Sequence, residues 1–183
     1  MKLGASAAWN LNFPVGWTSS DRNSALYSGF SVGGDVLIEW PKGWIFKSGI
    51  KAGFDHNRLN SSVKNDNQVT LDRWKLGVPA IAGYKFDVYR DFCIAPLTGL
   101  EFDYFFSTGT SWPLPGDRLS SAQLWNPCNL DWKIGAGIFM YDMVEVDILG
   151  SFGIFKANKH RNDLIYTTNY LPLQMSIALT IYF

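Results

Sequence analysis

The two histidines are the first residues in this sequence that could do chemistry. His56 directly follows Asp55, and His160 stands three residues before Asp163. With a serine in reach, either pair could form a Ser-His-Asp set, in which the histidine accepts the proton of an attacking hydroxyl. The candidate serines are Ser61 and Ser107. Polar connecting segments commonly contain all three residue types, so the pattern favours solvated histidines. We therefore assign no catalytic residue and expect no enzyme.

Metal binding and disulfide formation are the other reactions to consider. Two separated histidines and two separated cysteines give no metal-ligand spacing, so neither a metal nor another cofactor is predicted. Cys93 and Cys128 stand at the starts of segments that we predict to be neighbouring antiparallel strands, which places the thiols at opposite ends. About ten residues of strand cover ~33 Å, beyond the reach of a disulfide. We expect two free thiols.

The charged residues balance in number and alternate with apolar ones. Lys and Arg total 16, Asp and Glu total 16, and no basic patch or stripe typical of nucleic-acid binding is present. The acidic residues could form an acidic cluster, but pairing with the bases is the simpler interpretation, because buried charges persist only when paired. We predict an interior salt-bridge network of Lys47, Lys51, Arg73, Lys75, Glu101, Asp103, Asp131, Lys133 and Asp147.

These side chains must be positioned by strands, because period-two alternation recurs along the whole chain. The predicted strands are 2–12, 29–40, 44–57, 71–86, 92–105, 130–141, 144–156 and 170–183. Short turns at 41–43, 87–91 and 142–143 alternate with long polar connections at 13–28, 58–70, 106–129 and 157–169. Both termini should therefore lie at the end with the short turns. We predict an all-β fold with one domain over 1–183, a transmembrane eight-stranded antiparallel up-and-down β-barrel.

The two faces of these strands decide between a membrane barrel and a soluble one. One face carries the large apolar and aromatic residues, and the other carries nearly all strand charges together with Gly, Ala and Ser. An eight-stranded barrel has interior room only for packed side chains, so the aromatic face should point outward to lipid. The soluble alternative is a lipocalin-like ligand binder with the faces reversed. We expect bulges or bends at Pro79, Pro96 and Pro172.

Two stretches carry a resemblance to a known family. The last segment, LPLQMSIALTIYF, ends at Phe183 with apolar residues at alternate positions, and resembles the C-terminal signal that the barrel-assembly machinery recognises in Gram-negative outer-membrane proteins. Tyr182, however, falls on the interior side. RWKLGVPAIAGYKF (73–86) resembles a strand of the small outer-membrane barrels of Bacteroidetes-type bacteria. The whole chain is similar to the eight-stranded barrels related to the OmpA membrane domain and OmpX.

That resemblance implies a multi-pass outer-membrane protein with periplasmic termini and with lipid bilayer and lipopolysaccharide as partners. The N-terminal residues lack the pattern of a signal peptide, so we expect an export signal to have been removed. The leading hypothesis is a structural or surface-interaction role, with an extracellular ligand or partner protein bound by the long connections. The apolar residues considered for such a surface are Trp112, Leu114, Leu119 and Trp125. The equal alternative is that this connection packs on itself or folds over the barrel mouth. The alternatives are a narrow porin-like channel for ions or small solutes and a lipid-modifying outer-membrane enzyme.

Overall fold

The computed structural model describes residues 1–15, 27–60, 68–111, 126–155 and 171–183, and every regular element in these ranges is a β-strand. The strands are β1 (Lys2–Val15), β2 (Tyr27–Glu39), β3 (Trp44–Asn60), β4 (Gln68–Tyr84), β5 (Phe86–Tyr89), β6 (Phe92–Ser111), β7 (Cys128–Met140), β8 (Val144–Gly153) and β9 (Leu171–Tyr182). No helix among the described residues is long and apolar enough to cross a membrane.

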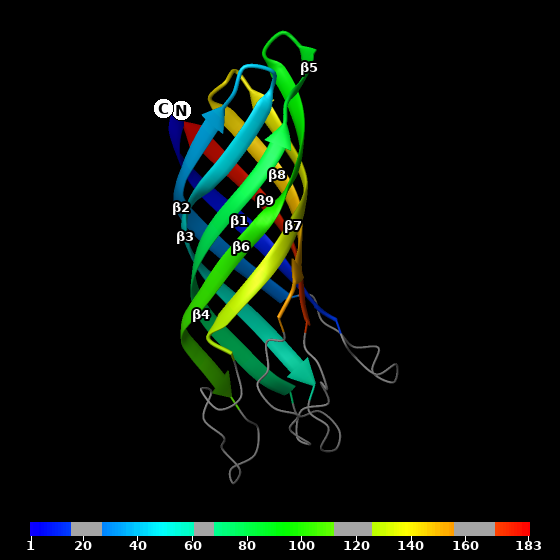
Figure 1. Cartoon of the computed structure of the whole chain (residues 1–183). Coiled ribbons are helices and arrows are strands. Elements are labelled where there is room, and N and C mark those ends of the chain that lie inside the picture. The colour runs from blue at the N-terminus through cyan, green and yellow to red at the C-terminus, as the bar shows by residue number, and fades with distance from the viewer. Residues whose placement is uncertain (16–26, 61–67, 112–125, 156–170) are drawn as a thin grey trace.

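Eight of the nine strands close into the predicted barrel (Figure 1). The sheet runs β4-β3-β2-β1-β9-β8-β7-β6, and β4 also pairs with β6, which joins the two ends. All pairings are antiparallel. β5 pairs only with β6, as a short extension of the β4–β6 pair beyond the barrel. Closure removes the free edges that an open sheet would expose, which is what a spanning sheet requires in lipid.

Several strands are longer than the hydropathy pattern predicts. β3 continues to Asn60, β4 begins at Gln68 and β6 continues to Ser111. The predicted long connection 106–129 is correspondingly shorter. Backbone pairing continues past the apolar alternation, because ladder hydrogen bonds need no particular side chain.

The three prolines interrupt the ladder without shifting its register. Pro79 and Pro96 keep the register of the strands beside them, and Pro172 lies opposite Pro14. Proline has no N–H for the ladder. The Pro79 carbonyl instead accepts a hydrogen bond from the Ser48 hydroxyl at 2.9 Å, and the β3–β4 pairing resumes on both sides.

The register shift within the barrel lies elsewhere, at Phe106. Trp74 pairs with Ser107 and Lys75 pairs with Phe105, which leaves Phe106 as an extra residue in β6. Of the bulges or bends expected at the prolines, the bulges are therefore wrong. A bulge needs an additional residue in one strand, whereas a proline removes one ladder donor and adds no residue.

The short turns have the backbone conformation of tight hairpins. Tyr141 and Asp142 have φ of 53° and 55°, Lys42 and Gly43 have φ of 101° and 84°, and Arg90 has φ of 26°. Positive φ in a short hairpin matches the right-handed twist of the strands. Both chain termini lie at the same end as these turns, as predicted (Figure 1). We call this end the turn end. The opposite end, where the segments between paired strands fall outside the described residues, is called the loop end.

Candidate functional site

The outer face of the barrel is apolar and exposed. Val32, Ile50 and Leu76 are 53%, 65% and 43% exposed, although each lies in the middle of a strand. Charged side chains of the same strands, such as Asp103 and Lys75, are buried inside. A soluble barrel would have the opposite arrangement, because exposing this much apolar surface to water is unfavourable. The outer face therefore fits a lipid environment, and the lipocalin-like alternative is wrong.

Aromatic side chains form two rows around this face. The turn-end belt consists of Trp40, Trp44, Tyr84 and Phe86, and the loop-end belt consists of Trp9, Phe30, Phe54 and Trp74. Ring centroids of Trp44 and Tyr84 are 5.4 Å apart, and those of Phe54 and Trp74 are 4.9 Å apart.

The spacing of the two belts matches a membrane. Trp44 and Phe54 are ten residues apart on β3, which is ~33 Å along the strand. A tilt of about 40° reduces this to ~25 Å along the barrel axis, the height of the apolar band in outer-membrane barrels. Rings at both interfaces are typical of membrane-spanning proteins, so the belts mark the two edges of the hydrocarbon layer.

The turn end of the interior is an apolar core, which the sequence interpretation did not foresee. Interior-facing side chains from most of the strands pack together there: Leu37, Ile45, Ile81, Ala95, Leu97, Phe139, Leu149 and Tyr182. The ammonium of Lys85 lies 3.9 Å from the centroid of the Phe139 ring. It also pairs with Glu39 at the rim. The core and its cationic cap fill the turn end of the barrel.

A buried ion cluster crosses the barrel next to this core. Lys47 in β3 lies 2.8 Å from Glu145 in β8, and it also pairs with Asp147. β3 and β8 are four strands apart in a ring of eight, so the pair spans the full width of the interior. The Tyr182 hydroxyl donates a hydrogen bond to Glu145 at 2.5 Å. The side chains of Lys47, Glu145 and Asp147 are at most 5% exposed.

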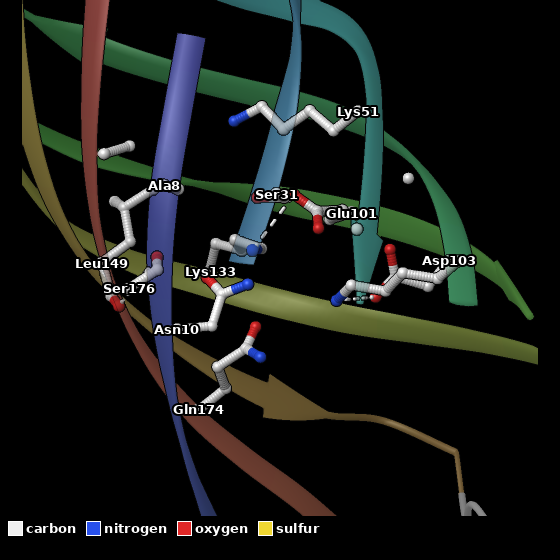
Figure 2. A pocket seen from close by; sticks show the side chains of 14 residues that line it. Ala8, Asn10, Ser31, Lys51, Glu101, Asp103, Lys133, Leu149, Gln174 and Ser176 are labelled. Carbon is white, nitrogen blue, oxygen red and sulfur yellow. Dashed lines mark hydrogen bonds and ion pairs between the residues drawn. The ribbon is translucent and has the colours of Figure 1, made fainter. Parts of the chain in front are cut away.

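A second group of charges lies closer to the loop end, as the strand registers show. Figure 2 shows Lys133, Glu101 and Asp103 of this group. Lys133 is 3.0 Å from Glu101, and Lys75 is 2.9 Å from Asp103 and 3.5 Å from Asp55. The remaining members of the predicted network are more weakly paired, with Lys51 3.9 Å from Asp35, Arg73 4.0 Å from Asp55, and Asp131 accepting a hydrogen bond from Asn129. The structure thus places all nine predicted charges inside the barrel.

Carboxylates outnumber bases in the described interior. The buried acidic residues are Asp35, Asp55, Glu101, Asp103, Asp131, Glu145 and Asp147, and the interior bases are Lys47, Lys51, Arg73, Lys75 and Lys133. Neutral donors contribute to the balance, since Tyr182 donates to Glu145 and Asn129 donates to Asp131. The voids among these side chains measure about 10 and 20 Å³. A water molecule needs about 10–15 Å³, so each void has room for no more than roughly one water.

A row of polar side chains lies on the outer face just beyond the loop-end belt. His56 Nδ1 is 2.5 Å from Asp72 Oδ1, and both side chains are partly exposed. Because an ionised carboxylate can only accept a hydrogen bond, Nδ1 donates, and in a neutral imidazole Nε2 is then the unprotonated nitrogen. The β2–β3 pairing ends at Gly29↔Asp55; continued by one pair, it would put Ser28 opposite His56. We call Ser28, His56 and Asp72 the polar row.

This row corrects the sequence interpretation of His56. Its neighbour Asp55 points to the interior and pairs with Lys75, because successive residues of a strand face opposite sides. The carboxylate that holds His56 is Asp72, which the β3–β4 register brings alongside. Ser107 pairs with Trp74 on a strand beyond Asp72, two strands from His56. The other candidates, His160, Asp163 and Ser61, lie outside the described residues.

Three sets of predicted residues remain: the apolar surface residues, Phe183 and the two cysteines. Trp112, Leu114, Leu119 and Trp125 lie outside the described residues, so their role as a binding surface stays a prediction. Phe183 is 82% exposed at the turn end, where its N–H donates to the Leu3 carbonyl. Cys93 and Cys128 are free, as predicted. Among the described residues no group of three His, Cys, Asp or Glu side chains could hold a metal ion.

Comparison with known proteins identifies the fold. No family model and no curated protein matches the chain. Among solved structures, the outer membrane enzyme PagL matches with a TM-score of 0.53 and 14% identity, over 97% of this chain and 98% of that chain. Neisserial surface protein A matches with a TM-score of 0.50 and 16% identity, over 100% and 96%. Ail, the attachment invasion locus protein of Yersinia pestis, matches with 0.43 and 12%, over 100% and 97%.

The predicted resemblance to small eight-stranded outer-membrane barrels is confirmed at the level of the fold. The expectation that the chain is not an enzyme, which rested on the weak Ser-His-Asp pattern, was in contrast wrong to set catalysis aside. PagL is described as an outer membrane enzyme and has the same fold. Catalysis is therefore compatible with this barrel, and the fold alone does not choose between roles.

Proposed function

Starting from a chain with the fold of the small eight-stranded outer-membrane barrels, we propose that it is a closed membrane anchor that makes contacts through its loop end. The observation that carries this proposal is the filled interior. The Lys47–Glu145 pair crosses the barrel at 2.8 Å, and the apolar core lies beside it. A lumen occupied in this way leaves the ends of the barrel as the surfaces that can act on other molecules.

We further propose an orientation with the termini in the periplasm and the loop end outside the cell. All four segments between described strands at the loop end are longer than the turns at the other end, which is the usual layout of outer-membrane barrels. Phe183 lies at the turn end, and we propose that it is read by the barrel-assembly machinery. Replacing it by alanine should slow assembly of the chain into vesicles that contain this machinery, whereas an equal rate would contradict the assignment.

Lipopolysaccharide is the proposed contact of the loop end, through Trp112, Leu114, Leu119 and Trp125. The test compares binding of immobilised lipopolysaccharide by the refolded wild-type barrel and by a variant with serine at all four positions. The variant should fold, as judged by a heat-dependent gel shift, but bind several-fold more weakly. Equal binding by the two proteins would remove this surface from the proposal. Single-channel recordings of the same samples should show no conductance steps, and regular steps would favour the channel alternative.

The polar row favours a second candidate function, hydrolysis of an ester at the membrane surface. Ser28 Oγ would attack the ester carbonyl while its proton passes to His56 Nε2 and then to the leaving alcohol, with Asp72 orienting the imidazole. Water would then release the acid from Ser28. The row lies two residue pairs beyond the loop-end belt, where the ester bonds of a lipid meet the headgroups. PagL shows that an enzyme can be built on this fold.

The experiment for this candidate is covalent labelling of the folded barrel with a fluorophosphonate, which reacts with activated serines. Wild-type protein should be labelled, and both Ser28→Ala and His56→Asn should lose the label. Ser107→Ala is the matched control, since this serine also lies at the loop end but two strands from His56. An unlabelled wild-type protein, or labelling that persists in Ser28→Ala, would reject the hydrolase.

A further inference from the structure

The turn end of the outer face contains a groove that the preceding arguments do not use. It has a volume of about 630 Å³ and is lined mainly by Trp40, Pro41, Lys42, Trp44, Phe46 and Ala82. Hydrogen bonds between Trp40 and Trp44, and from the Gly43 N–H to the Trp40 carbonyl, hold the turn that forms one wall. The lining is apolar except for Lys42.

Small side chains explain why there is a hollow here. Ala82 pairs with Phe46 on one side and with Thr98 on the other. β4 therefore presents only a methyl group here, whereas it presents aromatic rings in the two belts. Both tryptophans are about half exposed, at 50% and 56%. The groove therefore runs from the turn-end belt toward the middle of the membrane span, along the path of a lipid acyl chain.

Lys42 supplies the polar end of the groove and has no partner within the described part of the chain. Two other described cations at this end are engaged, since Lys2 lies 3.2 Å from Glu39 and Lys85 also pairs with Glu39. Arg90 is exposed on another turn and does not line the groove. Lys42 is exposed at the tip of the β2–β3 turn, with a φ of 101°. A free ammonium at the edge of an apolar groove is complementary to an anionic headgroup whose hydrocarbon chain enters the groove.

We infer that this groove binds one glycerophospholipid of the leaflet at the turn end, with its phosphate on Lys42 and one acyl chain between Trp40, Trp44 and Ala82. The two tryptophans supply flat apolar walls at interfacial depth. Lys42 supplies the charge, and Ala82 supplies the space. The site lies on the opposite side of the membrane from the polar row, so it is independent of either proposed function.

The experiment uses full-length barrel in phosphatidylglycerol–phosphatidylcholine vesicles that contain a phosphatidylglycerol with a photoreactive acyl chain. After illumination, labelled peptides are quantified by mass spectrometry. Wild-type protein should be labelled preferentially in the segment 40–46. Lys42→Ala should reduce this labelling about fivefold, the factor expected for one interfacial lysine. Ala82→Leu, which fills the groove with a side chain suited to lipid, should also reduce it.

Arg90→Ala is the matched control, because Arg90 is an exposed cation on another turn at the same end. Its labelling of 40–46 should equal that of wild type, and excess inorganic phosphate should not compete, since the acyl chain contributes to binding. Equal labelling of Lys42→Ala and wild type, or labelling spread evenly around the barrel, would overturn the site. Loss of labelling in the presence of phosphate would show that the headgroup anion alone supplies the binding energy, and it would overturn the acyl-chain part of the site. A heat-dependent gel shift confirms that each variant is folded.

Discussion

Replacing Lys47 by methionine tests how much the ion cluster that crosses the barrel contributes to stability. The substitution removes the charge but keeps most of the side-chain volume, so little of its effect should come from a cavity. It leaves Glu145 and Asp147 facing each other in the interior, at 0% and 2% side-chain exposure, without their base. The Tyr182 hydroxyl still donates to Glu145, so one of the two carboxylates keeps a neutral partner.

The expected loss follows from that burial. Removing one member of a buried ion pair costs about 3–5 kcal/mol, because the remaining charge is left in a medium that solvates it poorly. With an m-value of about 2 kcal/mol per M of urea, the unfolding midpoint should fall by ~2 M. A triple variant with Lys47→Met, Glu145→Gln and Asp147→Asn should recover part of the loss, because no buried charge of the cluster remains.

The assay is urea unfolding in phospholipid vesicles, followed by tryptophan fluorescence and by the heat-dependent gel shift. Arg90→Met is the control, since that arginine is exposed on a turn outside the groove lining and its loss should change stability by less than about 0.5 kcal/mol. The reasoning is refuted if Lys47→Met unfolds at the same midpoint as Arg90→Met. It is equally refuted if the triple variant is less stable than Lys47→Met alone, because the loss would then not come from unpaired charge.

Three further outcomes are expected. Gly99→Ala should lower the unfolding midpoint, because its Cβ would lie 2.2 Å from a backbone carbonyl oxygen of β4. Gly34→Ala, whose Cβ would have no atom closer than 3.9 Å, should leave the midpoint unchanged, and equal midpoints of the two variants would contradict the close approach at Gly99. Cys93 and Cys128 should both react with maleimide in unfolded protein without reductant, and a mass two hydrogens lower before reduction would indicate a disulfide and a different register. Single-tryptophan variants from the two belts should be quenched by bromolipids confined to opposite leaflets, and quenching of both from one leaflet would disprove the ~25 Å separation.

Much of the barrel was predictable because its cause is local. Alternation along each strand places Glu145 and Tyr182 on the same interior side, and the structure joins them by a hydrogen bond. The short turns were predictable for the same reason, since Pro41, Lys42 and Gly43 leave room for nothing longer between two apolar segments. Strand number, faces and the position of the termini follow from these two patterns together.

What escaped prediction depends on register between strands. The sequence suggests Asp55 as the partner of His56, because the two are neighbours. In the structure His56 instead bonds to Asp72, sixteen residues away. Only the β3–β4 register brings His56 and Asp72 together. The sequence of a long connecting segment does not reveal that register, because it does not specify the geometry of the turn. The apolar core escaped for another reason. Leu97 and Phe139 occupy interior positions among polar ones, and only the closure of the barrel shows that they meet at one depth.

The depth at which the charges lie bears on whether the barrel can open. A conducting state must separate Lys47 from Glu145, since the two groups are joined across the full width of the interior. Separation costs about 3–5 kcal/mol if the charges stay buried. Moving one elementary charge through a potential of 100 mV supplies only about 2.3 kcal/mol, so a voltage of this size leaves the closed state favoured. Any conductance would therefore have to begin with water entering beside the apolar core, and Lys47→Met should not create it, because the core remains in place.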